Sequence, residues 1–477
     1  MEQDNTVHQN RSKKFIKAIG LYAIGNLGSK LITFLMVPLY TYFVNPIDYG
    51  FYDLSLTLIF FAIPFMTLQL RDGAFRFLVD NKDEDRRRFV VSFVYRVIFL
   101  TSIIAIMLGA LVEIFVPVRH LWLMLMLLIV MSFYEVVVQM SRGLGNTISF
   151  VWAGIISSIG IGVFSVLFVV CFDMGIKGVF LANILARLVA LSFVEIKDKI
   201  LKFYFIYKPN YGTIRKEIIK YSLPLMPGVV FWWILGSSDR IFIEHFLGLS
   251  ENGIYAVAYR LVSILQVLST IFYQAWQETA ITQYNSADRD SFFSDMFNNY
   301  IYLLSCILII FIFVLKTNYG WLVSEDFAES VQYLYPMAVS VFIFALVAFM
   351  DMGYQCTKDT KRTLPGIIIA AVVNIISNII LVKTIGLWGI ICSSILSYTV
   401  LLIYRIHDMK RYFKLSIYSK TMIPCVMLLL SGLCYYVLSP IWCNVVYIFI
   451  VITVMIYAMP TKVLYFIKSK IKIDNKT

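Results

Sequence analysis

Charged side chains interrupt one of the most apolar parts of this sequence. The stretch SSDRIFIEHFLG, residues 237–248, follows the apolar FWWILG and places Asp239, Arg240, Glu244 and His245 within seven positions. A charge at the centre of a membrane helix costs roughly 3 kcal/mol on insertion scales. These residue types do not indicate covalent catalysis. They indicate the binding of an ion or of an anionic group.

Two further cations lie in neighbouring apolar segments, Lys30 in the first and Arg260 in the one after Arg240. Counted at 1.5 Å per residue from the expected outer helix ends, all three lie roughly 9–20 Å below the outer surface. Cations at overlapping depths repel one another unless an anion or a carboxylate lies among them. Guanidinium groups bind phosphate oxygens in a bidentate manner, and lysine adds a point charge. We therefore predict a cationic binding cavity.

Polar residues accompany these cations. Asn26 and Thr33 stand at i−4 and i+3 from Lys30 and so share its helix face, which predicts a polar wall. Asp239 would limit the net positive charge next to Arg240. The alternative is structural: Glu244 stands at i+4 from Arg240, the spacing of an ordinary pair within one helix, and Glu244 and His245 would reach the outer interface.

The elements that must position these residues are membrane helices. The chain has 477 residues, of which 60% are hydrophobic and only 15% charged, whereas soluble domains are about half apolar and a quarter charged. Windows of roughly 20 apolar residues predict an all-α polytopic membrane protein with about fourteen transmembrane helices. They are expected near residues 16–43, 50–70, 89–116, 121–141, 148–172, 176–195, 219–246, 254–275, 297–315, 332–354, 364–383, 387–406, 418–438 and 441–461.

The net charge of +12 is distributed unevenly over the loops. One side collects most of the lysines and arginines, including the run at 86–88 and the connection at 195–218. The other side keeps only Arg119, Lys177, Lys316 and Lys383. By the positive-inside rule, both termini are expected in the cytoplasm and the chain in the cytoplasmic (inner) membrane. Membrane topology accounts for the basic runs, and we expect no nucleic-acid partner.

Metal and disulfide chemistry are not indicated. The seven cysteines stand singly, no C-x-x-C pair occurs, and the four histidines are scattered. We expect no metal and no cofactor. The loops on the outer side are short and carry no His/Asp/Glu constellation, so we expect that the protein is not an enzyme.

Two pairs of motifs indicate an internal repeat. VNPIDYGFYDL (44–54) and GLSENGIYAVA (248–258) each place a turn and G-x-Y before a helix. FDMGIKGVFLANIL (172–185) and KTIGLWGIICSSIL (383–396) share G-x-x-G. The offsets are similar, about 203 and 211 residues, as a parallel repeat gives. We predict two pseudo-symmetric six-helix lobes at 1–195 and 219–408, a cytoplasmic linker at 196–218, and two accessory helices with a basic tail at 409–477.

Several of these motifs together resemble the oligosaccharide flippases. They are PIDYGFY after a first helix with N-x-x-x-K (Asn26, Lys30), YSLPLMPG at 221–228, SSDRIFIEHFLG and NGIYAVAYR. That family exports O-antigen and capsule repeat units and belongs to the multidrug/oligosaccharidyl-lipid/polysaccharide superfamily. The similarity covers the first twelve predicted helices.

The resemblance implies a fold and a function. It implies two lobes around a central cavity, and a substrate that is a lipid-linked oligosaccharide on an isoprenoid diphosphate. Alternating access would flip it from the inner to the outer leaflet. It leaves open a coupling to H+ or Na+ through Asp239 or Glu244. Expected partners are the lipid-linked oligosaccharide, membrane lipid and polysaccharide assembly proteins.

Other charges suggest an entrance and a structural pair. Arg71 and Arg76 could draw an anionic head group into an inner mouth; the alternative is a membrane anchor with a local Arg71–Asp72 pair. Arg96 and Glu135 are expected at a depth of roughly 10 Å on successive antiparallel helices, which predicts an ion pair. Arg187, in mid-helix, faces either the cavity or a backbone carbonyl.

Three other functions remain open. A MATE-type drug/cation antiporter would have a cavity dominated by carboxylates and apolar surface. A polytopic polysaccharide polymerase or transferase would need a large outer loop or a catalytic cluster. A scaffold or channel is opposed only mildly by the repeat and the cations.

Overall fold

The computed structural model describes residues 32, 34–80, 83–203, 212–357 and 359–437, together with 447, 449 and 451. These residues form helices and connections, without a strand. Twelve of the described helices are long and apolar enough to cross a membrane, and they match the twelve predicted spans from 50–70 to 418–438. The all-α membrane fold is therefore confirmed. The first and last of the fourteen predicted spans lie largely outside the described residues.

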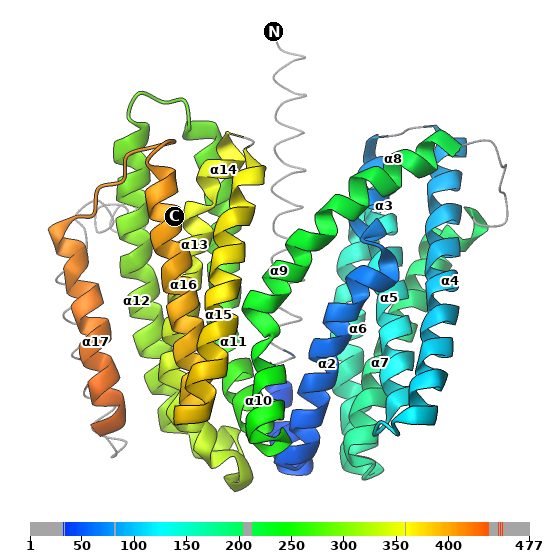
Figure 1. Cartoon of the computed structure of the whole chain (residues 1–477), viewed down its shortest axis with the longest axis horizontal. Coiled ribbons are helices and arrows are strands. Elements are labelled where there is room, and N and C mark those ends of the chain that lie inside the picture. Colours follow the sequence, from blue (N-terminus) through cyan, green and yellow to red (C-terminus); the bar gives the residue numbers. More distant parts are fainter. Residues whose placement is uncertain are drawn as a thin grey trace, which may run out of the picture. The chain divides into compact units, whose positions relative to one another are not determined.

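The chain divides into two compact units, unit 1 (Met1–Gly253) and unit 2 (Ile254–Thr477) (Figure 1). The helices of unit 1 are α2 (Pro46–Thr67), α3 (Leu70–Asp80), α4 (Glu84–Phe115), α5 (Leu121–Gly143), α6 (Thr147–Ser165) with the π-helical η1 (Val166–Cys171), α7 (Gly175–Asp198), η2 (Ile200–Phe203), α8 (Gly212–Ser222), η3 (Leu223–Leu225), α9 (Met226–Ser237) and α10 (Asp239–Leu247). A shorter apolar helix, Phe34–Phe43, precedes them.

Helix α11 (Leu249–Gln283) begins in unit 1 and continues into unit 2. The other helices of unit 2 are α12 (Arg289–Leu322), η4 (Glu325–Tyr333), α13 (Leu334–Met350), α14 (Met352–Cys356), η5 (Thr360–Arg362), α15 (Thr363–Ile385), α16 (Leu387–Met409), η6 (Ser419–Thr421) and α17 (Met422–Val437).

The boundary between the units differs from the predicted lobe boundary. Residues 219–253, expected in the C-terminal lobe, belong to unit 1. Contacts explain the difference, because α8 packs on α3 and α4 while α9 and α10 pack on α2. The predicted lobes, which rest on the repeat, stay a prediction.

Local sequence explains how α2 begins and ends. Asn45 caps the helix, accepting a hydrogen bond from the backbone N–H of Asp48 at 2.8 Å, and Pro46 occupies the first turn. Leu68 and Gln69 then adopt left-handed backbone conformations, with φ of 48° and 54°. The Gln69 N–H donates to the carbonyl of Pro64 at 3.0 Å. The chain therefore changes direction between α2 and α3 in the predicted inner-mouth region.

The two G-x-x-G motifs both lie at the start of a helix. Gly175 is the first residue of α7 and Gly386 directly precedes α16, with positive φ angles of 52° and 60°, which glycine adopts without strain. Three residues later, a Cβ on Gly178 would lie 3.1 Å from the backbone of Phe168, and one on Gly389 only 2.3 Å from that of Leu381. In each unit the missing side chain lets two successive helices pack closely.

The two G-x-Y motifs meet each other. A Cβ on Gly50 would lie 1.9 Å from the carbonyl oxygen of Leu249, and one on Gly253 would lie 2.1 Å from that of Pro46. The Asn252 side chain donates to the carbonyl of Gly50 at 2.7 Å. The starts of α2 and α11 are therefore in backbone contact, through matched residues of the two halves of the repeat.

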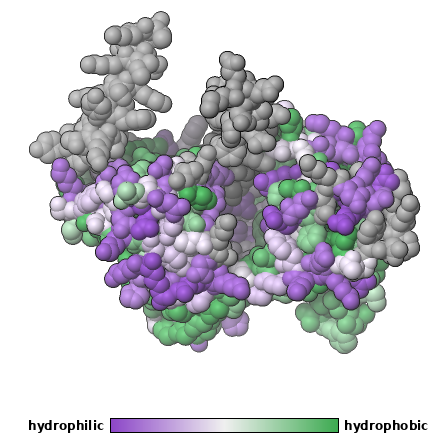
Figure 2. Space-filling model, turned by 90° about the horizontal axis from the view of Figure 1, so that it is seen from above, coloured by the Kyte–Doolittle hydropathy of each residue, from purple (hydrophilic) through white to green (hydrophobic). Residues whose placement is uncertain are grey.

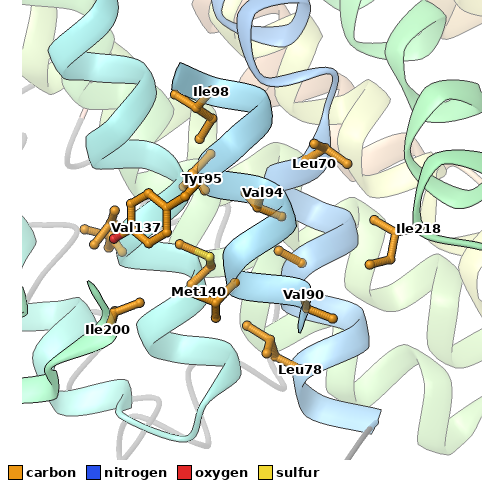
Figure 3. Close-up of a cluster of buried hydrophobic side chains, with 14 of the residues drawn as sticks. Leu70, Leu78, Val90, Val94, Tyr95, Ile98, Val137, Met140, Ile200 and Ile218 are labelled. Atoms are coloured by element: carbon orange, nitrogen blue, oxygen red, sulfur yellow. The ribbon is translucent and has the colours of Figure 1, made fainter. Parts of the chain in front are cut away.

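A hydrophobic core joins the helices at the α8 end of unit 1 (Figure 3). Ile214 and Ile218 stand at i and i+4 on α8 and are both buried, as one apolar face of a surface helix requires. Ile218 belongs to the same cluster as Leu70 and Leu78 of α3. Truncating a buried leucine such as Leu78 to alanine would cost about 2–5 kcal/mol.

Figure 2 shows hydrophilic residues over the ends of the helices in each unit. Basic residues at these helix ends include Lys199, Arg215, Lys361 and Lys410. In each unit, these are the helix ends that the positive-inside rule assigns to the cytoplasm; the orientation itself stays a prediction.

Candidate functional site

The stretch SSDRIFIEHFLG lies at a helix break. Helix α9 ends at Ser237, and the Ser238 hydroxyl donates to the Ile234 carbonyl at 2.6 Å. Helix α10 then starts at Asp239. A carboxylate in the first turn is favoured by the helix dipole, which helps to explain how a buried Asp239, 3% exposed, is tolerated there.

Arg240 is buried in an ion pair with Asp53 of α2. The Arg240 Nε and Asp53 Oδ2 atoms are 3.3 Å apart, and the two residues are 4% and 8% exposed. A second guanidinium nitrogen of Arg240 donates to the Gly236 carbonyl at 3.3 Å. Asp53 was missed in the sequence, although a carboxylate in an apolar span is itself a signal. In this conformation, an anionic ligand would have to compete with Asp53 for Arg240.

The other members of the predicted cavity are placed only in part. Glu244 and His245 lie on the exposed face of α10, and Arg260 is partly exposed on α11. Asn26, Lys30 and Thr33 lie outside the described residues. Arg240 and Arg260 belong to different units. The predicted meeting of Lys30, Arg240 and Arg260 therefore stays a prediction.

Glu135 pairs with Arg71 rather than with the predicted Arg96. The Arg71 Nη1 and Glu135 Oε2 atoms are 2.8 Å apart, while Arg96 lies on an exposed face of α4. Arg96 was predicted as the partner because of its expected depth. The rotation of each helix about its axis, however, decides which cation faces Glu135. The ion pair joins α3 to α5.

The two inner-mouth arginines are both engaged. Arg71 also contacts Asp72 at 3.5 Å, as the structural alternative expected. Burial alone would lower the pKa of Arg71, but Glu135 and Asp72 raise it above the usual value. Arg76 pairs with Asp80 at 2.9 Å on the exposed surface of α3. Their role as an inner mouth is not tested by these contacts.

Arg187 lies among polar side chains in the middle of α7. One guanidinium nitrogen donates to the Asn183 carbonyl at 3.0 Å and to the Asn183 side-chain oxygen at 2.9 Å. The Asn183 amide in turn donates to the Tyr52 hydroxyl at 2.9 Å. The carbonyl contact is one of the two arrangements expected for Arg187.

A second polar network lies at the predicted inner end of unit 2. Arg405, fully buried, has its Nε 2.8 Å from an oxygen of Asp351 and donates to the Tyr354 hydroxyl at 3.1 Å. Tyr354 donates to Asp408 at 2.7 Å. This network was not predicted from the sequence.

No metal site is apparent among the residues that the structure describes, since no group of three or more His, Cys, Asp or Glu is placed to hold an ion. The expectation that no cofactor is needed stays a prediction.

Residues 15–277, more than half of the chain, match the sequence pattern of a family described as polysaccharide biosynthesis protein. The chain belongs to this family. The resemblance seen in the motifs is thereby confirmed at the level of the family. No match was found among curated proteins.

Solved structures extend the comparison to the fold of this polysaccharide biosynthesis family member. An inward-facing multidrug resistance MATE family transporter of the MOP superfamily matches with a TM-score of 0.67 at 14% identity, over 82% of this chain and 98% of the other. The lipid II flippase MurJ, in an inward closed conformation, matches with a TM-score of 0.65 at 14% identity, over 94% and 99%. At such low identity these matches show a shared fold.

Proposed function

We propose that this protein flips a lipid-linked oligosaccharide, carried on an isoprenoid diphosphate, from the inner to the outer leaflet of the cytoplasmic membrane. The observation that carries the proposal is the combination of family and fold. The chain belongs to a polysaccharide biosynthesis family and shares its fold, over 94% of its length, with a lipid II flippase. Surface polysaccharide such as O-antigen or capsule would be the end product, and the proteins that assemble it would be partners.

Movement would proceed by alternating access, without covalent chemistry. The head group would enter from the inner side near Arg71 and Arg76, while the apolar tail stays in lipid. Lys30, Arg240 and Arg260 would offset the phosphate charge in turn, and Asn26 and Thr33 would contact sugar hydroxyls. The buried Asp53–Arg240 pair supports a regulated role for Arg240, because its guanidinium is compensated until an anion replaces Asp53.

A coupled ion remains part of the proposal. Asp239 and Glu244 are the carboxylates next to Arg240, one buried and one exposed. A carboxylate that changes partner during a cycle can take up H+ or Na+ in one state and release it in the other. Neutral amide variants of these residues would uncouple transport from the ion gradient.

A MATE-type drug/cation antiporter is the second candidate. It is favoured by the fold shared with a MATE transporter and by the buried carboxylates Asp53 and Asp239. Such a protein would extrude organic cations and would depend on its carboxylates more than on its arginines. A polymerase or transferase would instead require covalent chemistry.

The proposal can be tested in cells by reversing the charge of Arg240 and, separately, of Arg260. Export of surface polysaccharide would be followed together with the amount of folded protein in the membrane. We expect Arg260→Glu to abolish export at an unchanged protein level, and Arg260→Lys to restore it partly. Normal export in both charge-reversal variants would contradict the roles of these arginines. Extrusion of organic cations, with polysaccharide unaffected by deletion, would favour the antiporter.

A further inference from the structure

We propose that Arg187 is an additional anion-binding residue of unit 1, one that contacts the diphosphate of the lipid carrier; this inference rests on the proposed function. Arg187 stands at the middle of a 24-residue membrane-spanning helix, Gly175–Asp198, and is partly exposed. A cation at this depth is costly unless it has a partner. The contacts around it indicate what that partner is.

The visible contacts of Arg187 hold it without neutralising it. Its Nη1 atom bonds the carbonyl and the side-chain oxygen of Asn183, at 3.0 and 2.9 Å, and both acceptors are uncharged. Asn183 is itself fixed, since its amide donates to the Tyr52 hydroxyl and to the Val179 carbonyl, both at 2.9 Å. The hydrogen bonds to Asn183 therefore fix the guanidinium along one of its edges. A planar fork held by one edge keeps its other donors for a bidentate anion.

The carboxylate within electrostatic reach of Arg187 is already committed. It is Glu135 of α5, which forms its ion pair with Arg71 at 2.8 Å. Within the described part of the chain, Arg187 forms no ion pair of its own. Glu135 and Asp72 both contact Arg71, so the carboxylates of this region are engaged by Arg71, and a bound anion would give the Arg187 guanidinium an ion-pair partner of its own.

Aromatic hydroxyls complete the surroundings. Tyr40, Tyr52 and Tyr134 all lie within electrostatic reach of Arg187. They come from three different segments: the helix at 34–43, α2 and α5. Phenol hydroxyls can donate to phosphate oxygens. The group has the composition of a phosphate site, and a diphosphate is the anion that the proposed substrate supplies.

The test measures binding by the full-length protein in lipid nanodiscs. The probes are geranylgeranyl diphosphate, geranylgeranyl monophosphate and inorganic diphosphate, which separate a lipid head group from a free anion. The variants are Arg187→Gln, Arg187→Lys and Asn183→Asp. Asn183→Asp places a carboxylate beside the guanidinium and neutralises it without removing it. Arg86→Gln, at an exposed surface pair with Asp83, is the matched control. The melting temperature of each variant reports folding.

We expect the native protein to bind geranylgeranyl diphosphate more tightly than the monophosphate, with inorganic diphosphate competing at higher concentration. Arg187→Gln and Asn183→Asp should raise the dissociation constant about 10- to 100-fold at an unchanged melting temperature. Arg187→Lys should lose less affinity than Arg187→Gln, and Arg86→Gln should bind as tightly as the native protein.

Unchanged binding in folded Arg187→Gln would overturn this inference while leaving the proposed function intact. If Arg187→Gln does not fold, native binding by Asn183→Asp has the same meaning. Failure of the native protein to bind any of the three probes would instead overturn the proposed function together with this inference.

Discussion

The two units build the predicted inner ends of α7 and α16 from different chemistry. In unit 1, Asp198 at the end of α7 accepts hydrogen bonds from Ser141 at 2.5 Å and Ser149 at 2.9 Å. In unit 2, Asp408 at the end of α16 accepts from Tyr354, and next to it the buried Arg405 pairs with Asp351. Asp198 and Asp408 are 210 residues apart, one fewer than the 211 that separate the glycines at the other ends of these two helices.

The difference lies one helical turn earlier. Unit 1 has Glu195 three residues before Asp198, accepting from the Tyr95 hydroxyl at 2.6 Å, whereas unit 2 has Arg405 three residues before Asp408. Both helices therefore carry a carboxylate near their end, but the charge one turn earlier is opposite in the two units. A neutral donor can be lost at modest cost, but a buried ion that loses its partner is left uncompensated. Unit 2 should therefore be the more fragile of the two at this place.

The largest expected effect is that of Arg405→Met. Removing the guanidinium leaves Asp351 buried without its ion-pair partner, which should lower the free energy of unfolding by about 3–5 kcal/mol. Thermal melting of the purified protein in detergent would measure this loss. The double variant with Asp351→Asn should recover most of it. A double variant as unstable as the single one would show that the ion pair is not the cause.

The close contacts at Gly178 and Gly389 give the next comparison. Gly389→Ala puts a Cβ 2.3 Å from backbone atoms that cannot move aside, whereas Gly178→Ala puts one at 3.1 Å. We expect a loss of about 3 kcal/mol for Gly389→Ala and about 1 kcal/mol for Gly178→Ala. Equal melting temperatures for the two variants would show that the two glycine contacts are equally tight.

Asp198→Asn should have a smaller effect. It removes the charge from an acceptor of two serine hydroxyls but keeps an oxygen for one of them, so about 1–2 kcal/mol is expected. The same melting assay, with Ser192→Ala at an exposed hydroxyl as control, would measure it. A loss as large as that of Arg405→Met would contradict the contrast between the units.

The smallest effect is a dependence on pH in a surface cavity of unit 1. Asp48, Arg119, His120, Asp173 and Lys177 are among its lining residues. Partial burial, then Arg119 and Lys177, lower the pKa of His120 below its usual 6.5, against the opposing effect of Asp48. The folded protein then binds fewer protons than the unfolded chain. Stability should therefore be complete above about pH 6.5 and should fall as the pH drops below it.

His120→Gln should reduce this slope. Melting temperatures at pH 8 and pH 5.5 would show a smaller difference for the variant than for the native protein. An identical difference in the two proteins would show that other groups cause the acid sensitivity.

The membrane helices could be predicted well from the sequence. Apolar windows located all twelve described spans, because length and hydropathy alone decide whether a helix can cross a membrane. The glycines at 175, 178, 386 and 389 could be recognised as structurally required, because a positive φ and a close backbone contact both exclude side chains. Hydropathy and the need for glycine depend on the residue itself and on its neighbours in sequence.

The partners of the charged residues could not be predicted in the same way. Depth alone suggested Arg96 for Glu135, yet Arg71 makes the contact. Asp53 and Arg240 are 187 residues apart, and Asp351 and Arg405 are 54 apart. Pairing of this kind depends on the rotation and bending of each helix, as at the break between α9 and α10, which hydropathy does not specify.

The most direct measurement is transport by the purified protein in liposomes. Vesicles would contain a fluorescent oligosaccharide on a polyprenyl diphosphate, and the lipid that reaches the opposite leaflet would be detected by an enzyme that modifies only accessible glycan. We predict protein-dependent movement of this lipid, reduced at least about tenfold in Arg260→Glu. Vesicles in which the glycolipid does not move, while an organic cation does, would contradict the proposed function.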